Sequence, residues 1–352
     1  MSFRDAPLIC PICSSLLTQQ ERRLLCANAH SFDIARAGYV NLLGSYKNSH
    51  NLGDDKTMLH ARRAFLQRGH YMAILNAVKR IVAHLVSVRK SSVPNRSLRD
   101  SIGFTTELTE RFLADAAGDG AMTDGTMTDE TMTDETMTDG AMTRPCWVAD
   151  MGCGEGFYLH GVMQHLAGSI RGVGLDISKE AVRLAAGQNK AGAFAAANIN
   201  RQVPLADQSV DLLLNIFAPR NAAEFARVLA PEGFLVVVIP TAAHLHEWRA
   251  ALTAQGATPL PIAQAKQQRT EHQFSDYFAP YPTRQNGQAA AHVHEVCYRI
   301  TLDQTDLQNL LTMTPNAWHI AAEDQKRVHS LTQLSTTVSV QILTLQRGPR
   351  NS

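Results

Sequence analysis

The chain has 352 residues and 45% of them are hydrophobic, which is enough to bury a large core and to form more than one domain. No apolar run approaches the roughly 18 to 20 residues that span a membrane, and no signal-peptide pattern opens the chain, so neither a membrane partner nor secretion is expected. Six cysteines in a chain of this length do not indicate a disulfide scaffold, and we expect a cytoplasmic protein.

The net charge of +1 hides a strong asymmetry along the chain. Residues 1–90 carry 13 Lys and Arg against 5 Asp and Glu, whereas residues 91–143 carry 3 against 11. A basic segment favours nucleic-acid binding, because Lys and Arg neutralise phosphates. A solvated basic face would give the same count, so charge alone leaves both interpretations open.

Near the N-terminus, cysteines and a histidine have the spacing of metal ligands. Two residues separate Cys10 from Cys13, and three residues separate Cys26 from His30. Each pair can sit on one tight turn, so that four soft ligands converge tetrahedrally on zinc. Because four protein ligands close the shell, the pattern predicts a structural zinc site in a zinc-binding module over residues 1–45.

A basic helical connector is predicted over residues 46–90. Its apolar residues recur every three or four positions over 58–88, with a break near Gly69. Five basic residues between these apolar positions could face solvent or RNA: Arg62, Arg63, Arg68, Lys79 and Arg80.

Residues 91–146 form an acidic insert. From Ala121 to Thr143 a five-residue Met-Thr-Asp unit repeats, and a period of five matches neither a helix nor a strand. We expect a disordered acidic linker, because little in this composition could form a core. Acid clusters could in principle bind a cation, and any role of the insert is left open.

A glycine turn follows a short apolar strand that ends in Asp150. The turn has the pattern G-x-G-x-G, with Gly152, Gly154 and Gly156. A second apolar run ends in Asp176, 20 residues further on. A dinucleotide-binding turn would need a third glycine where this chain has Phe157. The pattern is instead typical of methyltransferases that use S-adenosylmethionine (SAM), although an ordinary tight turn is the alternative.

Strands and helices alternate from this turn onward. Strands are expected at 147–151, 170–175, 193–197, 210–216 and 233–239, with helices near 156–167, 178–188, 221–230 and 243–254. Two further strands at 294–302 and 336–346 flank a helix at 303–313. This order predicts an α/β fold, a seven-stranded Rossmann-like SAM-dependent methyltransferase sheet, over residues 147–352.

Each candidate cofactor residue has a chemical reason. Backbone N–H groups of the glycine turn suit the carboxylate of SAM, and Glu155 lies in the same turn. Asp176 would accept hydrogen bonds from the ribose hydroxyls. Asn198 follows the third strand, where methyltransferases commonly contact the adenine amino group; a plain turn residue is the alternative.

The loop after the fourth strand lies where methyltransferases place the methyl acceptor. Phe217 could stack on a base and Asn215 could hydrogen-bond to its edge, so both are candidate catalytic residues. Packing of Phe217 in the core is the alternative. No general base can be assigned.

Several motifs resemble one family, the bacterial 23S rRNA (guanine-N1)-methyltransferases of the RlmA type. They are the CPxC…C…H knuckle, FDxAxxGYVNLL at 32–43, ARRAFLxxGHY at 61–71, DMGCGEGFY at 150–158, His244-Leu within Pro240–Trp248, and MTPxAW at 313–318. The acidic insert has no counterpart in the family, and residues 251–295 are only loosely similar.

The resemblance implies zinc, SAM and a homodimer that methylates N1 of a guanine in a hairpin loop of 23S rRNA. It also implies that Tyr71 and His244 contact the cofactor. A small-molecule methyltransferase with a structural zinc module is one alternative, and a non-catalytic zinc-bearing RNA-binding protein is another. The basic N-terminal segment disfavours the first, and the intact glycine turn with Asp176 disfavours the second. The sequence does not identify the guanine.

Overall fold

The computed structural model describes residues 3–44, 53–91, 145–252, 266–283, 291–313 and 330–348. The predicted acidic linker and most of the motif at 313–318 lie outside these ranges. The described parts of residues 1–90 and 145–352 belong to one compact unit.

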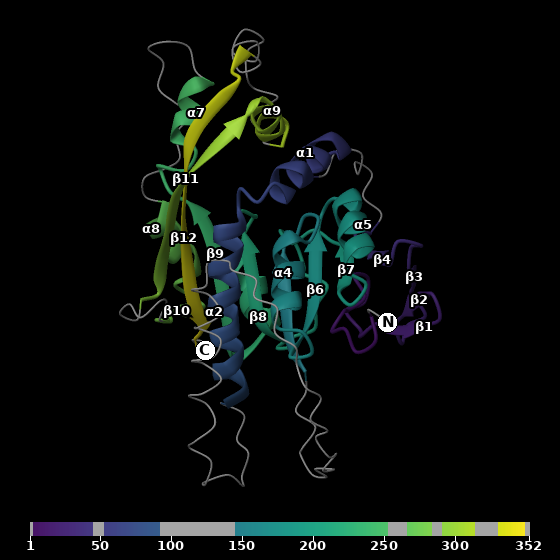
Figure 1. Ribbon diagram of the computed structural model, residues 1–352. Helices are drawn as coiled ribbons and strands as arrows, with labels where there is room; N and C mark the ends of the chain where they lie inside the picture. Colours follow the sequence, from purple (N-terminus) through teal and green to yellow (C-terminus); the bar gives the residue numbers. More distant parts are fainter. Residues whose placement is uncertain are drawn as a thin grey trace, which may run out of the picture. The chain divides into compact units, whose positions relative to one another are not determined.

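A mixed sheet forms the centre of this unit (Figure 1). Six parallel strands lie in the order β9, β8, β5, β6, β7 and β4. Their bounds are Leu229–Pro240, Val210–Ile216, Cys146–Met151, Ile170–Asp176, Ala193–Ala196 and Tyr39–Asn41. The antiparallel strand β12 (Gln333–Arg347) lies beside β9 and also pairs with β10 (Phe278–Pro280) and β11 (Val293–Asp303).

Alternating side chains give the sheet two buried faces, because successive residues of a strand point to opposite sides. Val148, Leu212 and Val236 belong to one core cluster, and Ala149 and Leu213 belong to the other. The first cluster includes residues of α2 (Met72–Ser91), α4 (Phe157–His165) and α5 (Lys179–Gln188). The second includes residues of α6 (Ala222–Val228), α8 (Lys266–Phe274) and the zinc-binding segment.

The fold class predicted from the sequence is confirmed, since every predicted strand from 147 onward is present within a few residues of its expected bounds. Among the described residues the sheet has nine strands instead of seven. The two additional strands, β4 and β10, have three residues each, which is too short for a periodic pattern to show.

The zinc-binding segment is built on a small antiparallel sheet of β1 (Thr18–Gln20), β2 (Arg23–Leu25) and β3 (Ser31–Asp33). It packs directly on the main sheet. Ile9 N–H donates to Pro204 O at 3.0 Å, and Ala206 N–H donates to Pro7 O at 2.9 Å. The segment then continues into β4, which extends the edge of the main sheet beyond β7.

Helices α1 (Lys56–Gln67) and α2 join at an elbow near Gly69, where the sequence predicts a break. Among the described residues, no single helix is long and apolar enough to cross a membrane; α1 and α2 pass that test only as a pair bent by 80°. Helix α1 packs against α9 (Gln304–Thr312), while α7 (His246–Ala251) packs on β12.

Candidate active site and metal centre

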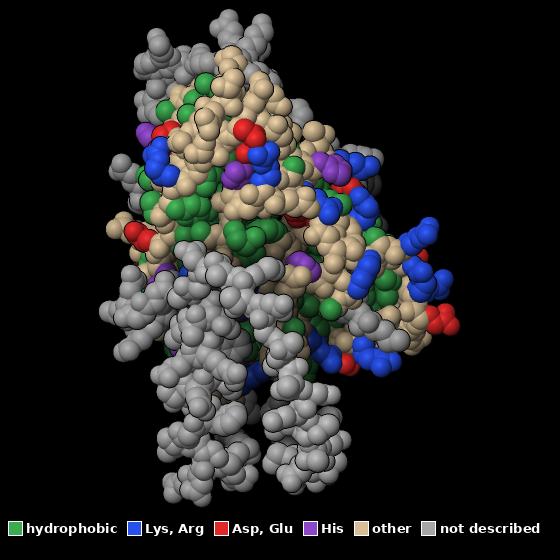
Figure 2. Space-filling view, viewed as in Figure 1, with side chains coloured by type: hydrophobic (Ala, Val, Ile, Leu, Met, Phe, Trp, Pro, Cys, Tyr) green, Lys and Arg blue, Asp and Glu red, His purple; other side chains and the backbone are tan. Residues whose placement is uncertain are grey.

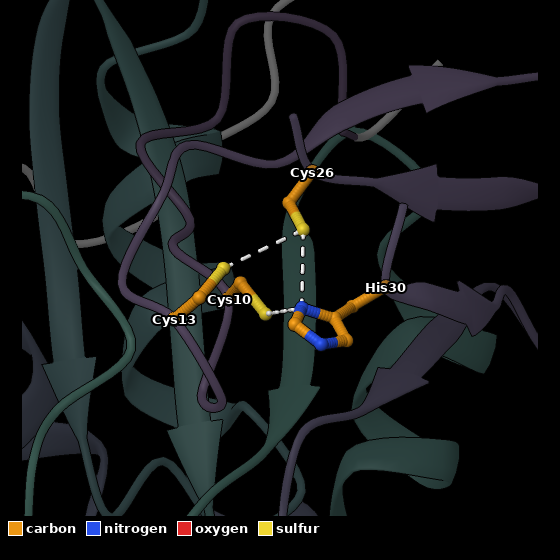
Figure 3. Close-up of side chains that lie close together, drawn as sticks. All are labelled: Cys10, Cys13, Cys26 and His30. Carbon is orange, nitrogen blue, oxygen red and sulfur yellow. Dashed lines mark hydrogen bonds between the residues drawn. The ribbon is translucent and has the colours of Figure 1, made fainter. Parts of the chain in front are cut away.

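The four predicted metal ligands converge in the zinc-binding segment (Figure 3). Cys26 Sγ lies 3.4 Å from His30 Nδ1, Cys10 Sγ lies 3.5 Å from the same nitrogen, and Cys13 Sγ lies 3.6 Å from Cys26 Sγ. Ligand atoms bound to one tetrahedral zinc at about 2.0 to 2.3 Å would lie about 3.5 to 3.8 Å apart. The donor set and its spacing therefore fit zinc.

Local geometry prepares the Cys13 thiol for metal binding, whereas burial raises the pKa of Cys10 against the opposing backbone hydrogen bonds. Ile12 N–H donates to Cys10 Sγ at 3.4 Å. Hydrogen bonds from the backbone and side chain of Ser15 lower the pKa of Cys13 to about 5. A thiolate at neutral pH is the form that binds zinc, so the turn favours metal binding before the metal arrives.

The glycine turn occupies the carboxyl end of β5. All three glycines have positive φ, at 83° for Gly152, 54° for Gly154 and 83° for Gly156. A Cβ on Gly152 would lie only 2.5 Å from the Ala218 side chain, so the close approach of the two loops requires a glycine there. The predicted turn is thus brought against the predicted acceptor loop.

Asp176 connects this turn to the end of β6. Its Oδ2 accepts from Gly154 N–H and its Oδ1 accepts from Ser178 N–H, both at 2.8 Å. Burial raises the pKa of the carboxyl group, although these two hydrogen bonds oppose that shift. Each carboxylate oxygen keeps a lone pair that could accept from a ribose hydroxyl.

Buried acids around the turn have oxygens without partners among the described residues. Asp150 Oδ1, Glu155 Oε2 and the Tyr158 hydroxyl are each buried and unpaired. Burial and the neighbouring Asp176 raise the pKa of Asp150 to about 8. Burial raises the pKa of Glu155 to about 7, against the opposing effect of Arg63 and Arg62. Such groups fit a cationic, hydrogen-bonding ligand, as the ammonium group of SAM would be.

The start of α1 closes over the turn. Asp54 O accepts from Ser178 Oγ at 2.9 Å, and the Asp54 carboxylate pairs with Arg62. Arg62 Nη2 also donates to Met313 O at 3.2 Å, and its guanidinium lies about 4 Å from the Cβ that Gly154 lacks. Arg62 therefore faces the glycine turn, with 26% of its side chain exposed, and a contact of Arg62 with RNA stays a prediction.

Arg68 is also paired within the chain. Its guanidinium lies 2.6 Å from Asp303 and 3.0 Å from Asp306, which is 1% exposed. These contacts fasten the elbow between α1 and α2 to the N-terminus of α9.

Three rings from distant parts of the chain meet beside the turn. The Tyr71 ring lies 5.9 Å from the His244 ring and 6.1 Å from the Phe217 ring, and the last two lie 5.9 Å apart. Phe217 is 40% exposed and has a φ of 53°, which is strained for a residue other than glycine. The alternative that Phe217 packs in the core is therefore wrong.

Hydrogen bonds determine the tautomer of His244. Its Nδ1 accepts from Ser339 N–H at 3.2 Å, so the proton of the neutral ring lies on Nε2, 3.2 Å from the Tyr71 hydroxyl oxygen. Burial lowers the pKa of His244 to about 4, so the ring is neutral at physiological pH. Tyr71 thus accepts from His244 and keeps its own O–H to donate elsewhere.

The other two candidates, Asn215 and Asn198, form hydrogen bonds within the chain. Asn215 is fully buried, and its Nδ2 donates to Met151 O at 3.2 Å and to Pro219 O at 2.8 Å, while its Oδ1 has no partner among the described residues. Asn198 Oδ1 accepts from Asn200 N–H at 3.0 Å and so stabilises the turn after β7. Asn198 lies two residues beyond Ala196, which is the pairing partner of Asp176. An adenine contact stays a prediction.

Sequence reasoning missed part of the site. Asp54 is preceded by Gly53 and followed by the helix-capping Asp55, and that local pattern was the available signal. Tyr158 and the free oxygen of Asp150 lie inside a recognised motif, yet only the packed structure shows that they are buried without partners.

A doubly wound α/β sheet with this glycine turn and an acid at the end of the next strand defines a class, the SAM-dependent methyltransferases. The sequence matches the family description "RlmA, N-terminal" over residues 8–50 and "Methyltransferase domain" over residues 144–279.

Curated relatives narrow this class. The chain is 30% identical to the 23S rRNA (guanine(748)-N(1))-methyltransferase of Streptomyces fradiae over 344 residues, 95% of each chain. It is 33% identical over 316 residues to a Micromonospora griseorubida protein whose name assigns it 23S rRNA guanine-N1 methylation, covering 89% of this chain and 87% of that one. The chain belongs to the 23S rRNA (guanine-N1)-methyltransferase family.

Proposed function

We propose that this protein transfers a methyl group from SAM to N1 of a guanine in a hairpin loop of 23S rRNA. The observation that carries the proposal is the exposed, strained Phe217, which lies beside the Gly152 turn in a chain that also has the zinc-binding segment of the family. Relatives along almost the whole chain are named for this reaction.

The cofactor would be held at the ends of β5, β6 and β7. Backbone N–H groups around Gly154 would bind the SAM carboxylate, and the free oxygens of Asp150 and Glu155 would receive its ammonium group. Asp176 would hold the ribose and Asn198 the adenine. Cys10, Cys13, Cys26 and His30 would hold the structural zinc.

Bound SAM supplies a methyl group already activated on a sulfonium, so the chain mainly has to position the acceptor. Phe217 would stack on the target guanine, which must leave its own stack to be reached. The free Asn215 Oδ1 can only accept a hydrogen bond, which suits the N–H donors of guanine. The Tyr71 hydroxyl, held by His244, would donate to an acceptor on the cofactor or the base. The N1 proton must leave during transfer, and no residue is assigned to take it.

Exposed Lys and Arg side chains support docking of RNA. Figure 2 shows them gathered over β1–β3 and α5. Exposed basic residues in or next to these elements include Arg22, Arg23, Arg36 and Lys190, and the exposed Arg171 lies at the start of β6. The 23S rRNA would be methylated in the cytoplasm, and a homodimer, which the family resemblance implies, is part of the proposal to be checked by light scattering.

Mapping N1-methylguanosine in 23S rRNA tests the function. Reverse transcription stops at this base, because the methyl group blocks Watson–Crick pairing. We expect one stop in wild-type rRNA that disappears in a deletion strain and returns when purified protein and SAM are added to the deletion-strain rRNA. Identical stops in both strains would contradict the proposal. Methyl transfer to small cellular molecules but not to rRNA would favour the small-molecule alternative.

A further inference from the structure

Basic side chains from three separate segments gather beside the acceptor loop. Arg220 directly follows Pro219, Lys266 begins α8, and Arg249 lies in the last turn of α7. Gln273 of α8 donates to Arg220 O at 3.4 Å, and Arg249 Nε donates to His244 O at 3.0 Å. The Gln273 contact brings α8 to the loop that carries Phe217, and the His244 ring, 5.9 Å from the Phe217 ring, brings the start of α7 to the same loop.

The charges of this cluster act on one another. The positive charge of Arg220 lowers the pKa of Lys266, second to the effect of burial. After burial, the charges of Arg249 and Lys266 lower the pKa of His244. The cluster therefore reaches from Arg220 through Lys266 to the His244 ring, which lies 5.9 Å from the Phe217 ring.

Within the described residues, Arg220 and Lys266 have no carboxylate partner, unlike Arg62, Arg68 and Arg227, which all form ion pairs. Arg220 Nε is buried without a hydrogen-bond partner. Holding two half-buried like charges together without a counter-ion is unfavourable for the protein alone. An anionic ligand would remove that cost, which makes the cluster a candidate anion site.

The neighbouring Phe217 identifies the anion. A base stacked on this exposed ring would bring its own backbone phosphates to the adjacent residues of the same loop, and Arg220 is three residues away. We propose that Arg220 and Lys266 bind a backbone phosphate of the RNA next to the target guanine. This inference rests on the proposed function. It adds to that function the residues that would position the RNA backbone beside the unstacked target guanine.

Charge-neutral variants test the site directly: Arg220→Gln, Lys266→Gln and the double variant. Arg269→Gln is the matched control, because Arg269 is an exposed cation on the same helix. Each variant would be measured for SAM affinity by calorimetry and for methylation of a synthetic hairpin that contains the mapped guanine, over a range of salt concentrations.

We expect each single variant to raise the KM for RNA about ten-fold, and the slope of log KM against log salt to fall by about 0.7 to 0.9 for each lost phosphate contact. SAM affinity should not change, which separates an RNA phosphate from the SAM carboxylate as the bound anion. The Arg269→Gln control should keep the wild-type KM and salt slope.

Hairpins with one neutral methylphosphonate linkage locate the phosphate. One linkage beside the target guanine should weaken wild-type binding about as much as the double variant does, and should cause no further loss in that variant. Variants with wild-type KM and salt slope, or with weakened SAM binding alone, would overturn the phosphate site. A wild-type enzyme that methylates no rRNA would instead overturn the proposed function itself.

Discussion

At the scale of single residues, the structure gives Asp176 a role in shaping the glycine turn, beside the ribose contact that we propose for it. The carboxylate shapes the glycine turn through Gly154 N–H and Ser178 N–H, and it also faces the proposed ribose position. The same group therefore organises the pocket and would bind the ligand.

Replacing Asp176 tests the proposed ribose contact. Asp176→Ala should weaken SAM binding by about 1.5 to 3 kcal/mol, the scale of a hydrogen bond to a charged group. Asp176→Asn should lose less, because the amide oxygen can still accept. Calorimetry on both variants checks this order, and unchanged SAM affinity in Asp176→Ala would refute the ribose assignment.

The pKa of Asp150 predicts a pH dependence of SAM binding. In the free protein this carboxyl group has a pKa of about 8, so it is largely protonated at pH 7. A cationic ligand favours the ionised form, so SAM binding should release protons, and affinity should rise from pH 6 towards pH 8.5. Calorimetry in two buffers of different ionisation enthalpy measures the released protons. The Asp150→Asn variant should show a weaker pH dependence, and an equally steep one would contradict the assignment.

At the scale of elements, the sequence predicts those that have a long periodic pattern. Strands β5, β6, β8 and β9 each contain a short run of mainly apolar residues, and the break between α1 and α2 follows from the Gly69 turn. The metal ligands were predictable because all four lie within 21 residues. The ring cluster was not predictable from periodicity, since Tyr71 and His244 are 173 residues apart. Only the family resemblance implied that Tyr71 and His244 both contact the cofactor.

The elbow of α1 and α2 depends on the contact of Arg68 with α9. Arg68→Gln leaves the buried Asp306 with His70 at 3.0 Å and the Asp303 backbone N–H at 3.4 Å but without the guanidinium, so the variant should lose about 1 to 3 kcal/mol of unfolding free energy. Arg183→Gln removes an exposed i,i+3 pair with Glu180 and should cost less than about 0.5 kcal/mol. Urea unfolding compares the two, and equal losses would contradict a structural role for Arg68.

At the scale of the whole molecule, the zinc-binding segment and the methyltransferase sheet share one core. Leu8, Leu17 and Leu24 belong to the same cluster as the strand residues Ala149 and Val173. The hydrogen bonds of Pro7 and Ile9 to residues 204–206 lie a short distance after Asn198. Loss of zinc should therefore disturb the proposed cofactor site as well as the N-terminal segment.

Metal removal tests this connection. Purified protein should contain one zinc per chain, and Cys13→Ser should release it, expose residues 3–44 to proteolysis and weaken SAM binding. A variant that loses zinc but keeps wild-type SAM affinity would show that the two sites are independent. Absence of zinc in freshly purified protein would refute the metal site.

The acidic repeats at 119–143 stay a prediction from composition. Deleting them should leave zinc content and SAM affinity unchanged, because loop closure costs only about 0.6 kcal/mol per doubling of length. If their acids instead screen the basic segment, the deletion would raise affinity for unrelated RNA at low salt only. Loss of SAM binding on deletion would contradict both possibilities.

The unpaired acids beside the glycine turn also affect what happens after the reaction. SAM arrives with a positive charge on sulfur, and this charge disappears when the methyl group leaves, so the spent molecule is neutral at that atom. If Asp150 and Glu155 bind the SAM ammonium group as proposed, they keep that contact with the product and lose only the attraction to the sulfonium charge. In that binding mode, methyl transfer would reduce the attraction between these carboxylates and the bound molecule, which would favour release of the product.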